Sequence, residues 1–173
     1  MIYVLHVQTG QEMAIRDELR RMYFGAMVPR EIALERKNGK EIQRERTLFQ
    51  GYVFVDMAMD LKAYYKIKGI PHVIRFLGDK QPTELSRKEA EYITWLASGG
   101  KPLQPSELDQ DGAVMTGPLK GHEPEIVSVN TRAKRAKVRI TLAGEPHEIS
   151  LSVVTAAGDS DGDTEEADGE PLK

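Results

Sequence analysis

The chain of 173 residues contains no cysteine. This absence excludes a disulfide framework, a cysteine-ligated zinc site and a catalytic thiol. The chain also lacks any apolar run near the roughly 18 residues that a membrane helix needs. Its first residues show neither the basic nor the apolar region of a signal peptide. We therefore expect a cytoplasmic protein that does not bind a membrane.

Patterns that would support catalysis are also missing. The glycine-rich segment at residues 117–121 lacks the Lys-Ser/Thr ending of a phosphate-binding loop, and residues 123–125 (Glu-Pro-Glu) match no general acid-base pair. The four histidines have no metal-ligand spacing; they are His6, His72, His122 and His147. We therefore predict that the chain is not an enzyme and needs no metal and no cofactor.

Charge is distributed unevenly along the chain, whose net charge is −3. Residues 157–173 contain seven acidic residues and one basic residue, so this tail carries −6 and the rest of the chain carries +3. The tail has no aromatic residue and one leucine, which is too little apolar area to order it. We predict an acidic disordered tail that either aids solubility or competes for a basic surface of the same chain.

The N-terminal segment predicts a strand followed by a helix. Residues 3–7 are β-branched and aromatic, which is typical of a strand. Thr9 and Glu12 match a capping box at a helix N-terminus. An apolar stripe follows at spacings of four and three, formed by Ile15, Leu19 and Met22. Three arginines lie off this stripe and are expected to face solvent: Arg16, Arg20 and Arg21.

A charged hairpin and an apolar strand are predicted next. Residues 26–29 begin a second strand, and Asn38-Gly39 is a hairpin turn between the charged arms at residues 31–37 and 40–46. We expect this hairpin to project unburied from the domain. Residues 48–57 are apolar on both faces, as in a central strand. Gly51 lies where we expect another group to approach the backbone.

The following elements complete an N-terminal domain. Asp60 can cap a short helix that ends near residue 67, and residues 73–77 form a further strand. Ser86 and Glu89 match a second capping box. Residues 98–106 combine glycine and proline, as flexible linkers do.

The C-terminal region has the pattern of a small β module. Short strands with close turns are predicted at residues 113–116, 125–129, 136–142 and 148–154. We predict an α+β fold. An antiparallel sheet flanked by helices occupies residues 1–97, a linker residues 98–107, an SH3-like β-barrel residues 108–156 and the acidic tail residues 157–173.

The order of these features resembles the NusG family of transcription elongation factors, called Spt5 in archaea and eukaryotes. Four stretches carry the resemblance: YVLHVQTGQE at 3–12, MVP at 27–29, LFQGYVFV at 48–55 and GPLKG at 117–121. They resemble the opening strand and helix start, the second strand, the signature strand and the start of the KOW motif. The match extends over residues 1–154 in the family's order and implies an NGN-type domain followed by a KOW barrel.

Two departures distinguish the chain from the family's usual pattern. Gln50 stands where the signature strand normally has proline, and residues 123–125 replace a glycine-containing turn, so this loop must be rebuilt. These departures and the basic run at residues 131–139 resemble the specialised paralogs of the LoaP type. The LoaP resemblance implies processive antitermination in bacteria, with a barrel that reads RNA.

The resemblance also implies which residues bind RNA polymerase. The N-terminal domain would dock on the clamp helices of the largest subunit through aromatic and apolar residues. These candidates are His6, Phe49, Tyr52, Phe54, Phe76 and Leu77. Aromatic anchors dominate interface energies, but Tyr52 and Phe54 could instead be core residues. The non-template DNA strand would lie on the exposed face of the first helix, at Arg16, Arg20 and Arg21, although three such arginines are commonly a solvated face.

A cationic cluster in the barrel is the candidate RNA site. Its members lie on a turn, on the solvent-exposed face of the strand that follows it and on a neighbouring loop. They are Lys120, His122, Arg132, Lys134, Arg135, Lys137 and Arg139. Such a cluster suits phosphates, and few aromatics accompany it, so a hairpin read through its shape and backbone is favoured over stacked bases. An ordinary solvated strand face is the alternative.

Three functions therefore remain open. The first is a monomeric antitermination factor that links RNA polymerase to nascent RNA. The second is a general NusG-type elongation factor whose barrel binds proteins, such as ribosomal protein S10 or Rho. The third is a ribosome-associated RNA-binding module, against which the aromatic strand near Tyr52 argues.

Overall fold

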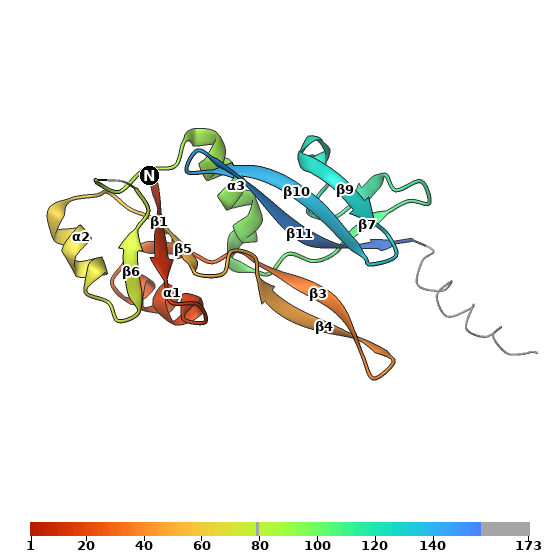
Figure 1. Ribbon diagram of the computed structural model, residues 1–173, viewed down its shortest axis with the longest axis horizontal. Helices are drawn as coiled ribbons and strands as arrows, with labels where there is room; N and C mark the ends of the chain where they lie inside the picture. The colour runs from red at the N-terminus through yellow and green to blue at the C-terminus, as the bar shows by residue number, and fades with distance from the viewer. Residues whose placement is uncertain (79, 157–173) are drawn as a thin grey trace, which may run out of the picture. The chain divides into compact units, whose positions relative to one another are not determined.

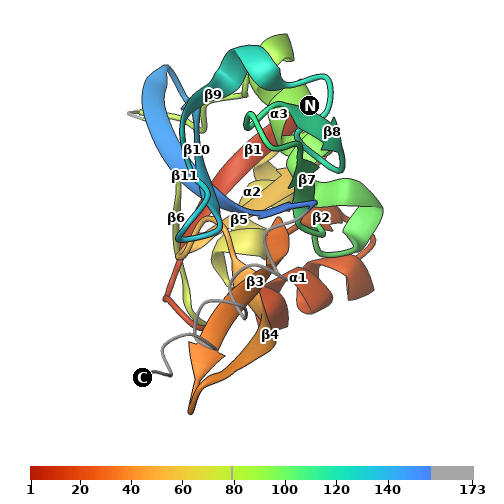
Figure 2. The same ribbon diagram turned by 90° about the vertical axis from the view of Figure 1, so that its right-hand side faces the viewer.

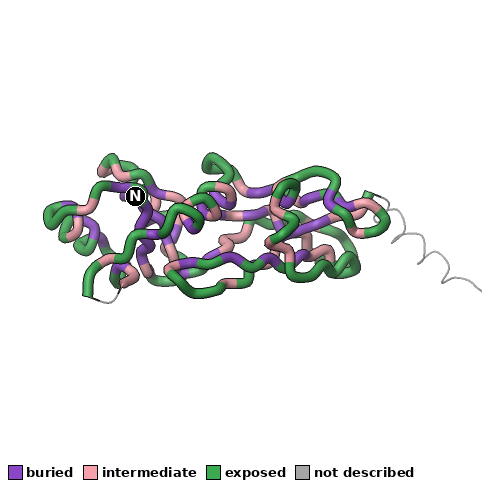
Figure 3. The backbone as a smooth tube through the Cα atoms, turned by 90° about the horizontal axis from the view of Figure 1, so that it is seen from above, coloured by how far each residue is buried: buried purple, intermediate pink, exposed green. Residues whose placement is uncertain are grey.

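The computed structural model describes residues 1–78 and 80–156, so the predicted acidic tail lies outside the described residues. The chain divides into two units, which are described separately. The first unit contains residues 1–30, 46–103 and 140–147, and the second contains residues 31–45, 104–139 and, of the described residues, 148–156. Most buried residues lie in strands. Figure 3 shows where buried and exposed residues fall along the chain.

The first unit is built on a four-stranded sheet with the order β2-β5-β1-β6. Figure 1 labels β5, β1 and β6 of this sheet. Its strands are β1 (Ile2–Val7), β2 (Gly25–Met27), β5 (Tyr52–Asp56) and β6 (Val73–Phe76). All pairs are antiparallel. The strand predicted at residues 48–57 is shorter than expected because Gly51 adopts φ 85°, in the left-handed region, and the chain turns there before β5 begins.

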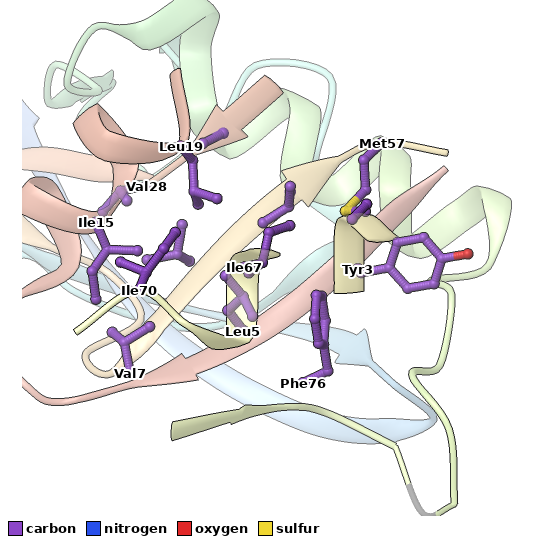
Figure 4. Packing of buried hydrophobic residues seen from close by; sticks show 14 residues of the cluster. Tyr3, Leu5, Val7, Ile15, Leu19, Val28, Met57, Ile67, Ile70 and Phe76 are labelled. Atoms are coloured by element: carbon purple, nitrogen blue, oxygen red, sulfur yellow. The ribbon is translucent and has the colours of Figure 1, made fainter. Parts of the chain in front are cut away.

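Two helices cover one face of this sheet and close its core (Figure 4). They are α1 (Glu12–Arg21) and α2 (Leu61–Lys68). Leu5 from the sheet, Leu19 from α1 and Ile67 from α2 are each 0% exposed and belong to one cluster. Burying each such side chain contributes roughly 1.5–3 kcal/mol. The predicted stripe is confirmed at Ile15 and Leu19, which are both buried.

The capping box predicted at Thr9 is wrong. The N-cap of α1 is Gln11, which makes no side-chain cap, because the chain passes through Gly10 at φ 96° before the helix begins. The Glu12 carboxylate instead accepts hydrogen bonds from the Gly10 amide at 3.0 Å and the Gly51 amide at 2.6 Å. The predicted close approach at Gly51 is thus made by a buried carboxylate, which joins the start of α1 to the turn before β5.

The other two predicted caps are confirmed. Asp60 Oδ1 accepts from the Ala63 amide at 2.7 Å at the start of α2. At the start of α3 (Arg87–Ala97), Ser86 and Glu89 form the complete capping box. A short 3₁₀ turn, η1 (Ser98–Gly100), follows α3.

The C-terminal sheet has five strands in the order β8-β7-β11-β10-β9 (Figure 2). They are β7 (Ser106–Leu108), β8 (Val114–Thr116), β9 (Ile126–Asn130), β10 (Arg135–Leu142) and β11 (Glu145–Thr155). Buried and exposed residues alternate along β10, as the sequence predicted. The α+β class and the SH3-like barrel are confirmed, although β7 was not predicted and begins inside the segment expected to be a linker.

The hairpin predicted around Asn38-Gly39 is present as β3 (Arg30–Lys37) and β4 (Lys40–Thr47), which form a two-stranded sheet (Figure 1). Both turn residues have positive φ, 54° and 78°, as a tight hairpin turn requires. The expectation that the hairpin is unburied is wrong for its first arm. Glu31 is 1% exposed and Ala33 is 4% exposed, because one face of β3 is covered.

None of the helices within the described part of the chain is long and apolar enough to cross a membrane.

We predict that Glu12→Ala lowers the free energy of unfolding by roughly 3 kcal/mol, since two amides lose a charged acceptor. Urea unfolding followed by circular dichroism measures this change, and hydrogen exchange at the Gly51 amide should accelerate. Glu18→Ala on the same helix is the control, because its pair with Arg21 is exposed and screened by solvent. Equal stability of the two variants would contradict the role assigned to Glu12.

Candidate functional site: an aromatic face and a cationic cluster

Four of the six predicted polymerase-binding residues come together on one face of the first sheet. The β1–β5 register places His6 opposite Tyr52 and Val4 opposite Phe54, so these side chains share the face away from the α1–α2 core. The rings of His6 and Tyr52 lie 5.8 Å apart. Phe49, in the turn before β5, packs edge-to-face on Phe54 at 5.4 Å.

Exposure differs within this aromatic face. Phe54 is 0% exposed and Phe49 is 4% exposed, whereas His6 and Tyr52 are half-buried. In this structure Phe54 is therefore a core residue, as the alternative interpretation of the sequence allowed, whereas Tyr52 is not fully buried. His6 and Tyr52 form the accessible part of the face, and Phe49 and Phe54 form its buried part.

Phe76 and Leu77 do not join this face. Phe76 lies opposite Leu5 in the β1–β6 register, and both side chains belong to the α1–α2 core. The Phe76 ring stacks on Tyr64 of α2 with centroids 5.4 Å apart. Leu77 follows the end of β6 and is half-buried, and its amide donates to the Val4 carbonyl at 2.8 Å. Sequence reasoning missed this division because it depends on the register.

Each of the three arginines predicted to bind DNA already has a partner. Arg16 pairs with Asp17 at 2.9 Å and Arg21 with Glu18 at 2.6 Å. The Arg20 guanidinium donates twice to the carbonyl of Ala26, at 2.9 and 3.2 Å. Burial, with the nearby charge of Arg16, lowers the pKa of Arg20. Arg20 thus anchors the end of α1 to β2, and Arg16 and Arg21 remain on the surface in exposed or half-buried pairs.

A pocket of about 430 Å³ lies between α1 and the segment that follows α2. Its lining combines apolar residues, such as Ile15 and Ile70, with the polar side chains of Lys66 and His72 and with the Arg21–Glu18 ion pair. Of the arginines predicted to bind DNA, Arg21 contributes to this lining. The pocket was not predicted, because its walls come from segments about fifty residues apart in the sequence.

The cationic cluster is brought together by β10 and the turn before it. Lys134 occupies that turn at φ 59°, and Arg135, Lys137 and Arg139 follow on β10. Glu148 of β11 accepts a hydrogen bond from Arg139 at 2.6 Å and lies 3.9 Å from Lys137. One carboxylate therefore balances part of the positive charge on this strand face.

Lys120 and His122 lie on the loop that leads from β8 toward β9. The Lys120 ammonium is 3.5 Å from the Val114 carbonyl, and His122 Nδ1 is 3.9 Å from Glu125. This loop contains the 3₁₀ turn η2 (Glu123–Glu125), which is how the chain rebuilds the turn that proline disrupts. Gly117 opens the loop at φ 101°, and a Cβ there would lie 2.5 Å from the Ser106 Cα, so no other residue fits.

Arg135 is held differently from the rest of the cluster. Its guanidinium donates to Ser150 Oγ at 2.8 Å, Ser152 Oγ at 2.8 Å, the Ser150 carbonyl at 2.7 Å and Glu31 Oε2 at 2.6 Å. The second Glu31 oxygen accepts from the Ser152 amide at 2.9 Å. Sequence reasoning did not identify Glu31, because no local pattern distinguishes it from the other acids of a charged arm.

The described residues contain no group of three or more His, Cys, Asp or Glu side chains that could hold a metal ion. The aromatic face offers apolar anchors, and the cationic cluster offers donors for anionic groups.

Comparison with known proteins gives a consistent result. A family model described as "Transcription termination factor nusG" matches residues 2–94. The transcription termination/antitermination protein NusG of Neisseria meningitidis is 29% identical over 152 residues, covering 83% of this chain and 85% of the relative. The protein of the same name from Pseudomonas aeruginosa is 30% identical over 169 residues, covering 88% and 96%.

A solved structure shares the fold. It is described as "Domain interaction in Thermotoga maritima NusG", and it superimposes with a TM-score of 0.54 at 22% identity. The similarity covers 87% of this chain and 92% of that one.

The exposed Glu148 carboxyl offers a direct check of the cluster's geometry. Its hydrogen bond from Arg139 holds the pKa of Glu148 below the ordinary value of 4.5, and Lys137 adds a smaller effect in the same direction. Because the pKa is depressed, the contact contributes its full stabilisation above pH 4.5. This stabilisation is lost as the pH falls through the lowered pKa and the carboxyl becomes protonated. Carbon-detected NMR titration should show Arg139→Gln raising this pKa more than Lys137→Gln. The opposite order would refute the arrangement.

Proposed function

Because this chain belongs to the NusG family of transcription termination and antitermination factors, we propose that it links RNA polymerase to nascent RNA. In this proposal, residues 1–97 dock on the clamp helices of the largest polymerase subunit, and the barrel at residues 108–156 contacts RNA. The family consists of transcription factors and not of enzymes, so the two surfaces described above are the functional sites.

The His6–Tyr52 pair carries the polymerase part of the proposal. The two rings are half-buried, lie 5.8 Å apart and rest beside the buried pair of Phe49 and Phe54. A partly exposed aromatic cluster on a rigid sheet is preorganised, so little conformational entropy is lost on binding. Phe76 is not part of this polymerase-binding surface, because its side chain lies in the α1–α2 core.

The cationic cluster supports the RNA part of the proposal. Arg132 is exposed in the turn before β10, and Lys137 and Arg139 project from the exposed positions of that strand. With few aromatics beside them, these side chains favour phosphate contacts on a folded RNA, and a hairpin is the target we propose. Processive antitermination of the LoaP type is the specific activity that fits such a barrel.

The proposal also includes a contact with DNA. The pocket beside α1, with Arg21 on its wall, is the place where the non-template DNA strand would lie.

The alternative to RNA binding is a general elongation factor whose barrel binds a ribosomal protein or Rho. The exposed Val127 and Val129 of β9 favour this alternative, since protein interfaces use apolar side chains.

We predict that Tyr52→Ala weakens binding to RNA polymerase by roughly 2 kcal/mol, or about 30-fold in Kd, as expected for an aromatic anchor. Biolayer interferometry with purified core polymerase measures the change. Tyr23→Ala removes an aromatic side chain that is 96% exposed elsewhere in the first unit and serves as the control. A Tyr52→Ala protein that melts normally and binds like the parent would place docking elsewhere.

We predict that Arg132→Ala and Lys137→Ala each reduce the salt dependence of RNA binding by about one unit of slope, since each removes a phosphate contact. The full chain is titrated with a labelled RNA hairpin between about 50 and 200 mM salt. Arg87→Ala on α3, whose side chain is 95% exposed, is the control. Unchanged slopes, or equal affinity for hairpin and unpaired RNA, would favour the protein-binding alternative.

A further inference from the structure

A buried acid of the β3–β4 hairpin contacts the cationic cluster of the barrel. Glu31 is 1% exposed, and both of its carboxylate oxygens are engaged, one by Arg135 at 2.6 Å and one by the Ser152 amide at 2.9 Å. Both residues are in the second unit, about a hundred positions later in the chain. A carboxylate that is removed from water needs such a charged, hydrogen-bonded partner.

The same hairpin holds the neighbouring cation. Glu41 of β4 forms a close ion pair with Lys134, which directly precedes Arg135. The two side chains are partly exposed, at 30% for Lys134 and 43% for Glu41. The hairpin therefore places one carboxylate on each of two adjacent cluster residues, Lys134 from the turn and Arg135 from β10.

These contacts compete with phosphate. Arg135 uses four of its donor interactions on Glu31, Ser150 and Ser152. A phosphate oxygen seeks the same guanidinium donors that a carboxylate takes. RNA can therefore use Lys134 and Arg135 only after Glu41 and Glu31 have left them.

The hairpin is suited to leaving. Its two strands form a sheet of their own, and an isolated two-stranded hairpin is marginally stable in water. The half of each strand next to the turn is largely exposed and charged. Its docking on the barrel uses the buried positions of β3, the two ion pairs and the hydrogen bond from the Ser152 amide to Glu31.

We propose that the β3–β4 hairpin is an intramolecular competitor of RNA, because Glu31 and Glu41 occupy the cluster residues Arg135 and Lys134. This inference rests on the proposed RNA-binding function and adds its regulation. RNA contact at Lys134 and Arg135 excludes hairpin docking, so the affinity of the full chain for an RNA that uses both residues equals that of the open barrel multiplied by the undocked fraction. Release of the hairpin also frees β3, so RNA binding changes the surface that the chain presents.

The first test measures RNA affinity in hairpin variants of the full chain. Glu41→Gln and Glu31→Gln each remove one negative charge that faces the cluster. Glu35→Gln removes the same charge from the same hairpin, but Glu35 pairs with Arg44 inside the hairpin. With a labelled RNA hairpin as the probe, we expect Kd to fall about tenfold in the first two variants, if nine of ten parent molecules are docked. Glu35→Gln should change Kd by less than about twofold. Glu41 is exposed, so its variant tests the proposal even where Glu31→Gln folds poorly.

The second test measures hairpin docking itself. The chain has no cysteine, so Lys37→Cys on the hairpin and Asp111→Cys on the barrel can be spin-labelled without background. Electron paramagnetic resonance should show one narrow distance in the parent and a broad distribution when the RNA hairpin is added or when Glu41→Gln is introduced.

The two measurements separate the possible failures. Tighter RNA binding together with a broadened distance supports the competition. RNA bound to a chain whose hairpin stays docked, with the same Kd in all variants, overturns the competition and leaves RNA binding intact. A variant that releases its hairpin and still binds no RNA overturns both the competition and the proposed RNA-binding function.

Discussion

The pairing of β1 with β5 is the constraint on which the first unit depends. It places Leu5 and Val53 on the face that α1 and α2 cover, and Val4 and Phe54 on the opposite face. Because side chains alternate along a strand, one register decides both the core and the candidate docking surface. The Glu12 carboxylate supports this register by binding the Gly51 amide where β5 begins. A shift by one residue would bury His6 and Tyr52 and expose the leucine and valines of the core.

The cost of burying charge organises the second unit in a comparable way. Glu31 is buried and Arg135 is partly buried; both are tolerated because each satisfies the other and the remaining Arg135 donors reach serine and backbone oxygens. Their pairing gives one arginine of the cationic cluster a different role from its neighbours. Arg132, Lys137 and Arg139 are surface charges, whereas Arg135 holds two segments of the chain together. A cluster that looks uniform in the sequence is therefore divided into a structural and an accessible part.

In the proposed function, the two surfaces serve an adaptor that contacts two large partners, RNA polymerase and RNA. Neither needs a catalytic group, and each is placed on strands whose positions are fixed by burial. The family to which the chain belongs acts in transcription termination and antitermination. That the chain belongs to this family explains why an aromatic sheet face and a small barrel occur together in it. In the further proposal, Glu31 and Glu41 of the hairpin occupy part of the cationic cluster until RNA phosphates displace them.

Local patterns in the sequence were sufficient for the elements whose causes are local. The capping box at Ser86, the cap at Asp60, the hairpin turn at Asn38-Gly39 and the alternation along β10 each depend on residues within a few positions of one another. The α+β class, the barrel and the family resemblance followed from their order. What only the tertiary structure decided involves partners far apart in the chain. Glu12 bonds Gly51 and not Thr9, Phe76 joins the core and not the docking face, and Glu31 lies buried against Arg135. A sequence read alone does not reveal these outcomes, because a buried polar group takes whichever partner the folded chain brings within hydrogen-bond distance.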